Sequence, residues 1–240
     1  MNKIKKAIDQ IPLPDQLNTV VQKSLQQQQI KKKKYLLLSS VAVLFLAIFG
    51  SSLAFSDYIS IPDFFKSKEE KLLQIDENEF IVQSEEFTIS LKQFVEYKEN
   101  ILLIHELNNF PYALMDADLV NQMIKDELLY MEAKKANISI DKEDVENYIS
   151  ELRLGLAELN DPIQNEIEAQ LAKSLQVNLD EYYKHPVTLA KYERLLTEDE
   201  FVQTLYERGI LNDQYTIEMY ENDLLLKYEK GITIYLEKLK

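Results

Sequence analysis

The chain of 240 residues contains no cysteine, only four glycines and only two histidines. Without cysteine the protein can form neither a disulfide nor a thiolate site, so packing alone must hold the fold. The glycines are scattered and form neither a phosphate-binding loop nor a nucleophile elbow. His105-Glu106 could begin a zinc-binding HExxH motif, but Asn109 replaces the second histidine. We therefore expect no metal, no cofactor and no enzymatic active site.

Charge is distributed unevenly along the chain. Residues 1–34 hold eight lysines and two aspartates, a charge of +6, whereas the whole chain carries −14. The rest of the chain therefore carries −20. Proteins that bind nucleic acid usually present a basic face, so the acidic remainder argues against a nucleic-acid partner.

An uncharged apolar stretch from Tyr35 to Phe55 follows the lysine run Lys31–Lys34. A helix of this length would reach roughly 31 Å, close to the thickness of the hydrocarbon core of a bilayer. Because lysines stay on the cytoplasmic side during insertion, the pattern predicts a single-pass protein of the cell membrane, in contact with membrane lipid. Its N-terminus would be cytoplasmic and its C-terminal domain extracytoplasmic. A cleaved signal peptide is the alternative, since Ser52-Leu53-Ala54 resembles a cleavage site.

These features divide the sequence into four segments. We expect a basic cytosolic tail at 1–34, a transmembrane helix at 35–55, a juxtamembrane linker at 56–78 and an extracytoplasmic domain at 79–240. The linker would be either a stalk or a first short helix.

The expected fold class is mainly α with a small β-hairpin. Residues 80–82 and 87–89 are apolar or β-branched and flank a polar turn, which predicts the hairpin. Ser90 and Gln93 match a capping box that begins the first helix of the domain. Apolar residues at helical spacing predict further helices. These helices are expected up to Pro111, over 113–136, from Asp141, after Pro162, after Asn178, after Pro186, from a capping box at Thr197 and Glu200 to Gly209, and over 213–239.

The region from 79 to 200 is similar to a known family. FIVQSEEFTISLKQFVEYK resembles the strand, turn, strand and helix that open the SurA and PrsA extracytoplasmic foldases. LVNQMIKDELLYMEAKKANISIDKEDVENYI resembles the two helices that follow in these proteins, and LAKSLQVNLDEYYKH resembles their next capped helix, with Asn178 at the cap. The last helix resembles the C-terminal helix that completes the N-terminal domain in this family. The resemblance therefore implies a SurA-N-like helical domain.

The parvulin isomerase module of these foldases has no counterpart here. That module is rich in strands and glycine, whereas residues 186–240 have helical spacing and only two glycines. We therefore expect a membrane-anchored extracytoplasmic chaperone- or foldase-like protein that binds unfolded or exported polypeptide without isomerase catalysis. In this family, clients bind in apolar clefts, where methionine and aromatic side chains adapt to many shapes. The residues expected to line such a cleft, each of which also fits a core position, are Phe110, Tyr112, Met115, Met123 and Tyr130.

The N-terminal tail suggests an alternative function. IDQIPLPDQLNTVVQKSLQQ, ahead of the lysine run, resembles the N-termini of some membrane-bound anti-sigma factors. The resemblance implies a transmembrane regulator whose tail binds a cytosolic protein partner such as a sigma factor.

Overall fold

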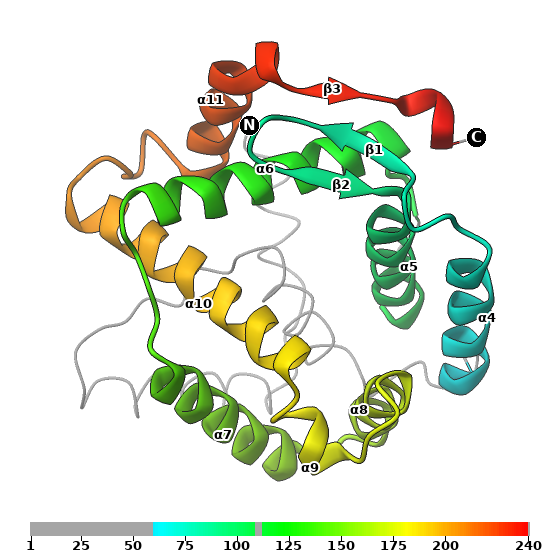
Figure 1. The fold of residues 1–240 in the computed structure, drawn as a ribbon. Helices are drawn as coiled ribbons and strands as arrows, with labels where there is room; N and C mark the ends of the chain where they lie inside the picture. Colours follow the sequence, from blue (N-terminus) through cyan, green and yellow to red (C-terminus); the bar gives the residue numbers. More distant parts are fainter. Residues whose placement is uncertain (1–59, 109–111, 240) are drawn as a thin grey trace, which may run out of the picture. The chain divides into compact units, whose positions relative to one another are not determined.

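The computed structural model describes residues 60–108 and 112–239, which all belong to one compact unit. The described residues form eight α-helices and three short strands (Figure 1). The fold is mainly helical, as the spacing of the apolar residues predicts.

The three strands form one antiparallel sheet in the order β2-β1-β3. β1 (Phe80–Gln83) and β2 (Thr88–Ser90) are the predicted hairpin. Ser84 fixes the turn between them, because its hydroxyl donates to the carbonyl oxygen of Phe87 and accepts from the Phe87 amide, both at 2.9 Å. The two middle residues of β1 are fully buried, so the sheet is part of the core.

Two helices pack against this sheet, α5 (Leu91–Leu107) and α6 (Asp116–Lys135). The predicted capping box is present at the start of α5. Ser90 Oγ accepts from the Gln93 amide at 3.1 Å, and Gln93 Oε1 accepts from the Ser90 amide at 2.8 Å. The sheet, these helices and one residue of α11 form the first core cluster. Its buried members are Ile81, Val82, Ile89, Phe94, Leu119, Val120, Ile124, Leu128 and Leu224.

Four helices contribute to or flank a second core cluster: α7 (Lys142–Leu159), α8 (Pro162–Ser174), α9 (Leu179–Tyr182) and α10 (Pro186–Glu207). Proline occupies the first turn of both α8 and α10, where its missing amide costs nothing. The predicted cap of α9 is present, since Asn178 Oδ1 accepts from the Glu181 amide at 3.0 Å. The buried members of the cluster are Val145, Ile149, Ala172, Tyr182, Tyr183, Tyr192 and Leu195.

α10 also packs against α6, and it does so as one unbroken helix. The predicted capping box at Thr197 and Glu200 is therefore wrong. Thr197 is fully buried in the middle of α10, and its hydroxyl donates to the carbonyl oxygen of Glu193 at 2.7 Å. This bond satisfies the hydroxyl inside the helix, so Thr197 does not stop it. Gly209, at φ +70°, follows the end of α10 as predicted.

α4 (Ile61–Leu73) lies within the segment predicted as a juxtamembrane linker. It contacts α5 and α8, and its buried residues Ile61 and Phe65 pack with Leu103 and Ile167. A first short helix was one of the two forms that the sequence allowed for this segment. The structure shows that this helix is packed into the described unit.

The C-terminal part differs from the predicted helix over 213–239. α11 (Ile217–Tyr228) ends earlier, and β3 (Thr233–Ile234) follows between two 3₁₀ turns, Glu229–Gly231 and Leu236–Leu239. The β-branched run at 232–234 favours a strand, and β3 pairs with β1 (Figure 1). Because α11 contacts α6, the end of the chain returns to the first core cluster.

The predicted membrane topology needs a correction. Among residues 60–108 and 112–239, no helix is long and apolar enough to cross a membrane. The longest of these helices, α10, carries charged side chains along its length, such as Lys191, Arg194 and Glu207. The structure thus corrects the predictions of a single-pass fold and of a cell-membrane location. The stretch 35–55 and the tail 1–34, on which those predictions depend, lie outside the described residues.

Candidate functional site

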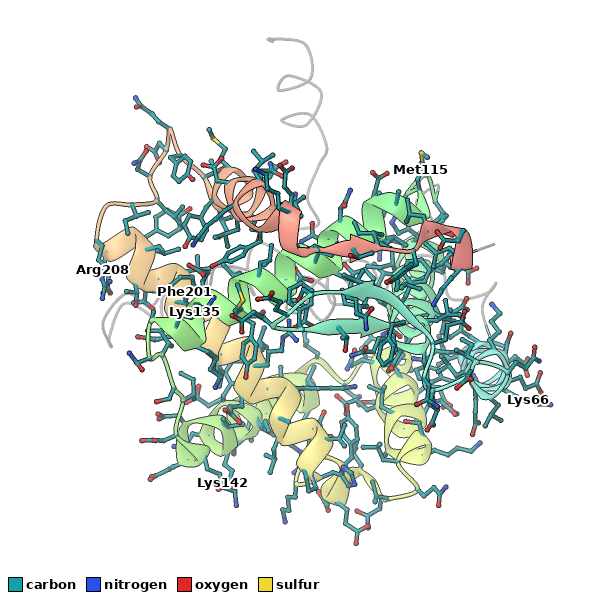
Figure 2. All side chains as sticks on the ribbon, turned by 45° about the horizontal axis from the view of Figure 1, so that its top comes forward. Lys66, Met115, Lys135, Lys142, Phe201 and Arg208 are labelled. Atoms are coloured by element: carbon teal, nitrogen blue, oxygen red, sulfur yellow. The ribbon has the colours of Figure 1, made fainter. Side chains whose placement is uncertain are left out.

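The residues predicted to line a client-binding cleft belong to α6 and to the segment before it. Phe110 lies outside the described residues. Tyr112 is half-buried against the first core cluster, and its ring meets the His105 ring edge to face at 5.5 Å. Burial raises the pKa of the Tyr112 phenol. Met115 precedes α6 as its N-cap residue and is 68% exposed (Figure 2).

Met123 and Tyr130 lie two turns apart on one face of α6. Met123 packs against the first core cluster. The ring of Tyr130 instead lies 4.8 Å from the Arg194 guanidinium and 5.2 Å from Lys134 Nζ, which is cation–π geometry. Met115 and Tyr130 are about 22 Å apart along the helix axis. These four residues therefore have different surroundings, and their part in binding stays a prediction.

Arg194 of α10 binds two carboxylates, one on α6 and one on its own helix. Its Nη1 donates to Glu127 Oε1 at 2.7 Å, and its Nε donates to Glu198 Oε1 at 2.8 Å. Glu198 is only 2% exposed, and burial raises its pKa to about 7 although the guanidinium opposes the shift. Because Arg194 pairs with both carboxylates, and its pair with Glu127 crosses from α10 to α6, we assign the network a structural role.

A second group of polar side chains is buried where α8, α9 and α10 meet. Gln164 Nε2 donates to Glu168 Oε1 at 3.1 Å, and three tyrosines lie near this carboxylate. Burial raises the pKa of Tyr182 to about 12, and it also raises the pKa values of Tyr183 and Tyr192. The phenols therefore stay protonated at neutral pH. This group forms a polar part of the buried core.

An open hollow of about 610 Å³ lies where α8 ends and α9 begins. It is lined by four apolar side chains, two amides and one lysine. These residues are Ala169, Ala172, Lys173, Gln176, Val177, Asn178 and Leu179. Ala172 also belongs to the second core cluster, so the floor of the hollow is continuous with the tyrosine-rich core. We call this feature the α8–α9 hollow.

The backbone between the two helices shapes this hollow. Gln176 takes the left-handed conformation at φ +57°, its amide donates to the Lys173 carbonyl at 2.9 Å, and the Val177 amide donates to the Ala172 carbonyl at 3.1 Å. This pair of bonds is a Schellman motif, which usually has glycine at the left-handed position. The motif brings Val177 back over Ala172. The Asn178 cap then starts α9 at once, so both helix ends border one concave surface.

Exposed apolar side chains occur on the elements around α9. Leu179 is at the rim of the hollow, Leu154 of α7 is 66% exposed, and Val187 is exposed in the first turn of α10. α7 and α9 are joined by an ion pair between Arg153 Nη2 and Asp180 Oδ1 at 2.5 Å. Of these three exposed apolar side chains, only Leu179 lines the hollow.

The lining of the hollow is mostly apolar. Lys173 is its one titratable side chain, and the described residues contain no group of histidines and acids that could hold a metal ion. Sequence reasoning missed this site. It identified the Asn178 cap, but Gln176 stands where the Schellman motif favours glycine, so nothing marked the reversal of the chain that creates the concavity.

No family model matches the chain, no curated protein matches it, and no solved structure matches it.

Proposed function

We propose that the protein binds unfolded polypeptide segments at the α8–α9 hollow and acts as a chaperone-like protein without isomerase catalysis. The observation that carries the proposal is the composition of the hollow. Its apolar lining from Ala169, Ala172, Val177 and Leu179 can receive apolar side chains, and the amides beside it can bond to a peptide backbone. The hollow is open, so a long chain can lie across it without entering a closed cavity.

The chemistry of the hollow favours a polypeptide over the substrate of an enzyme. An active site needs a nucleophile or a proton donor and acceptor within reach of the reacting atoms. The hollow offers one lysine, and the acids with strongly raised pKa values among the described residues, such as Glu198, are in other parts of the fold. An open apolar surface with few polar anchors makes contacts that do not depend on one particular side chain, so many sequences can satisfy them.

The topology of the described unit is consistent with the proposal. A hairpin is followed by helices, and a C-terminal strand pairs with that hairpin. The sequence at 79–200 resembles the opening elements of the SurA and PrsA foldases, but where that resemblance implies a long C-terminal helix the chain has α11 followed by β3. The likeness supports polypeptide binding by analogy of fold only. The alternative of a regulator rests on the tail at 1–34, outside the described residues, and stays a prediction.

A substitution that fills the hollow with a larger side chain tests the proposal. Ala169 is exposed in α8, and the substitution Ala169→Phe places a ring over the lining without touching a buried residue. The probe is a fluorescein-labelled eight-residue peptide of alternating leucine and serine with an amidated C-terminus, titrated with the full chain and followed by fluorescence anisotropy. We expect binding to weaken at least fivefold, because the ring occupies the space that a leucine of the peptide needs.

Ala157→Phe is the matched control. Ala157 is also an exposed alanine within a helix, on α7, so this substitution has the same cost in helix propensity, about 0.5 kcal/mol. The control should bind the peptide as the unchanged protein does. Equal affinity of both variants, or no binding by the unchanged protein, would contradict the proposal.

A further inference from the structure

Lys173 gives the α8–α9 hollow a charge that none of its other lining residues balances. It lies in the last turn of α8, its side chain is exposed, and no lining residue is acidic. Within residues 60–108 and 112–239 it forms no ion pair with a carboxylate. The ammonium group is therefore available to a ligand in the hollow.

The turn after α8 places a second hydrogen-bond donor beside this lysine. The backbone N–H of Gln176 donates to the Lys173 carbonyl at 2.9 Å, and the side chains of both residues line the hollow. An ammonium group and a carboxamide NH₂ group can both donate to one carboxylate. The apolar side chains of Val177 and Leu179 lie in the same lining. A ligand that suits these groups has a carboxylate next to an apolar side chain.

We propose that the α8–α9 hollow prefers polypeptide segments in which a carboxylate directly follows an apolar residue, with Lys173 as the partner of the carboxylate. This inference rests on the proposed function and adds the ligand class. Two sources offer the same chemistry, the free C-terminus of a polypeptide with an apolar last residue and an internal acidic side chain after an apolar residue. A neutral apolar segment still binds, but less tightly.

The net charge of the chain decides the conditions for the test. A chain with a net charge of −14 repels acidic ligands at long range, and this repulsion would mask a local contact at low salt. At about 0.15 M salt the Debye length is about 8 Å, so distant charges are screened while a direct contact with Lys173 persists. Binding should therefore be measured at this ionic strength.

The experiment compares three forms of the leucine–serine peptide, each ending in leucine before any added group. One form has a free C-terminal carboxylate, one has a C-terminal amide, and one has an added glutamate followed by an amide. With the full chain, the free acid should bind about two- to fivefold tighter than the amide, the range of a solvent-exposed ion pair. The glutamate form tests the internal source, and an equal gain there shows that either carboxylate is accepted.

Two lysine variants test whether Lys173 causes the preference for a carboxylate. Lys173→Gln should remove the preference, so that the ratio of the affinities for the free acid and for the amide falls to about one. Lys66→Gln is the control, because Lys66 is an exposed lysine of α4 (Figure 2) that does not line the hollow. Equal binding of acid and amide by the unchanged protein would overturn this inference and leave the proposed function standing. Failure of all three peptides to bind would refute the proposed function itself.

Discussion

The buried carboxyl group of Glu198 should make the stability of the fold depend on pH in a specific direction. Glu198 is 2% exposed between α10 and α6, and burial raises its pKa from the ordinary value of 4.5 to about 7, although Arg194 lowers it in part. The unfolded chain holds this proton only below its ordinary pKa. Between the two values the folded state binds more protons than the unfolded state, so stability falls as the pH rises.

The size of the effect follows from the shift in pKa. One pKa unit corresponds to 1.36 kcal/mol, so a rise from 4.5 to about 7 corresponds to roughly 3 kcal/mol. The contribution is fully present below the unfolded pKa and is lost as the pH rises through the folded pKa. Because relaxation around a buried charge reduces such values, we expect a loss on the order of 2 kcal/mol between pH 5 and pH 8.

The assay compares the unchanged protein with Glu198→Gln, whose side chain has nearly the same shape and does not titrate. Urea denaturation followed by circular dichroism gives the free energy of unfolding at pH 5, 6, 7 and 8. The difference between the two proteins should change by about 2 kcal/mol over this range, in favour of the unchanged protein at pH 5. Glu151→Gln, at an exposed position of α7, is the control and should give a constant difference. A constant difference for Glu198→Gln as well would refute the reasoning.

Three further predictions concern the helices and their ends. Ile124→Ala removes a side chain of α6 that is fully buried in the first core cluster, so it should lower the free energy of unfolding in urea by about 2–5 kcal/mol. Leu154→Ala, on the exposed face of α7, should change this free energy by less than about 0.5 kcal/mol. Asn178→Ala should cost about 1 kcal/mol of unfolding free energy because it removes a cap. Thr197→Val should cost less, because Thr197 lies inside a helix and caps nothing, and a larger loss for Thr197→Val would contradict this order. Gln176→Gly should raise the melting temperature, because a left-handed residue other than glycine costs about 1–2 kcal/mol, and a fall would show that the turn is not strained.

Much of the fold could be predicted from local signals. The hairpin follows from two short apolar runs around a polar turn, and the caps at Ser90 and Asn178 use side chains that bond within three residues. These signals depend on neighbours in the sequence, so they are reliable without tertiary information. α8 and α10 begin at prolines for the same local reason.

The errors arose where tertiary contacts outweigh a local pattern. Thr197 and Glu200 have the spacing of a capping box, but burial against α6 keeps α10 continuous through both. Apolar residues at 232–239 continue a helical spacing. Thr233 and Ile234 nevertheless form a strand, because they pair with the edge of β1 that β2 leaves unpaired. No pattern in one segment can show that such a partner exists.

The candidate site, too, could not be predicted from local sequence patterns. The sequence predicts the cleft residues because methionine and aromatic side chains adapt to clients, but the same residue types also fill cores, and Met123 packs against one. The α8–α9 hollow instead uses alanine, valine and leucine around a helix end. Its concavity depends on the left-handed Gln176, which is a property of the backbone that the residue type does not indicate.

Hydrogen exchange during titration with polypeptide tests the central claim most directly. The full chain is incubated in deuterated buffer with and without the amidated leucine–serine peptide, and exchange is read by mass spectrometry of proteolytic fragments. The α8–α9 hollow predicts slower exchange in fragments that cover residues 169–179, with α5 and the sheet unchanged. Protection confined to α6, or no protection in 169–179 at saturating peptide, would contradict the account.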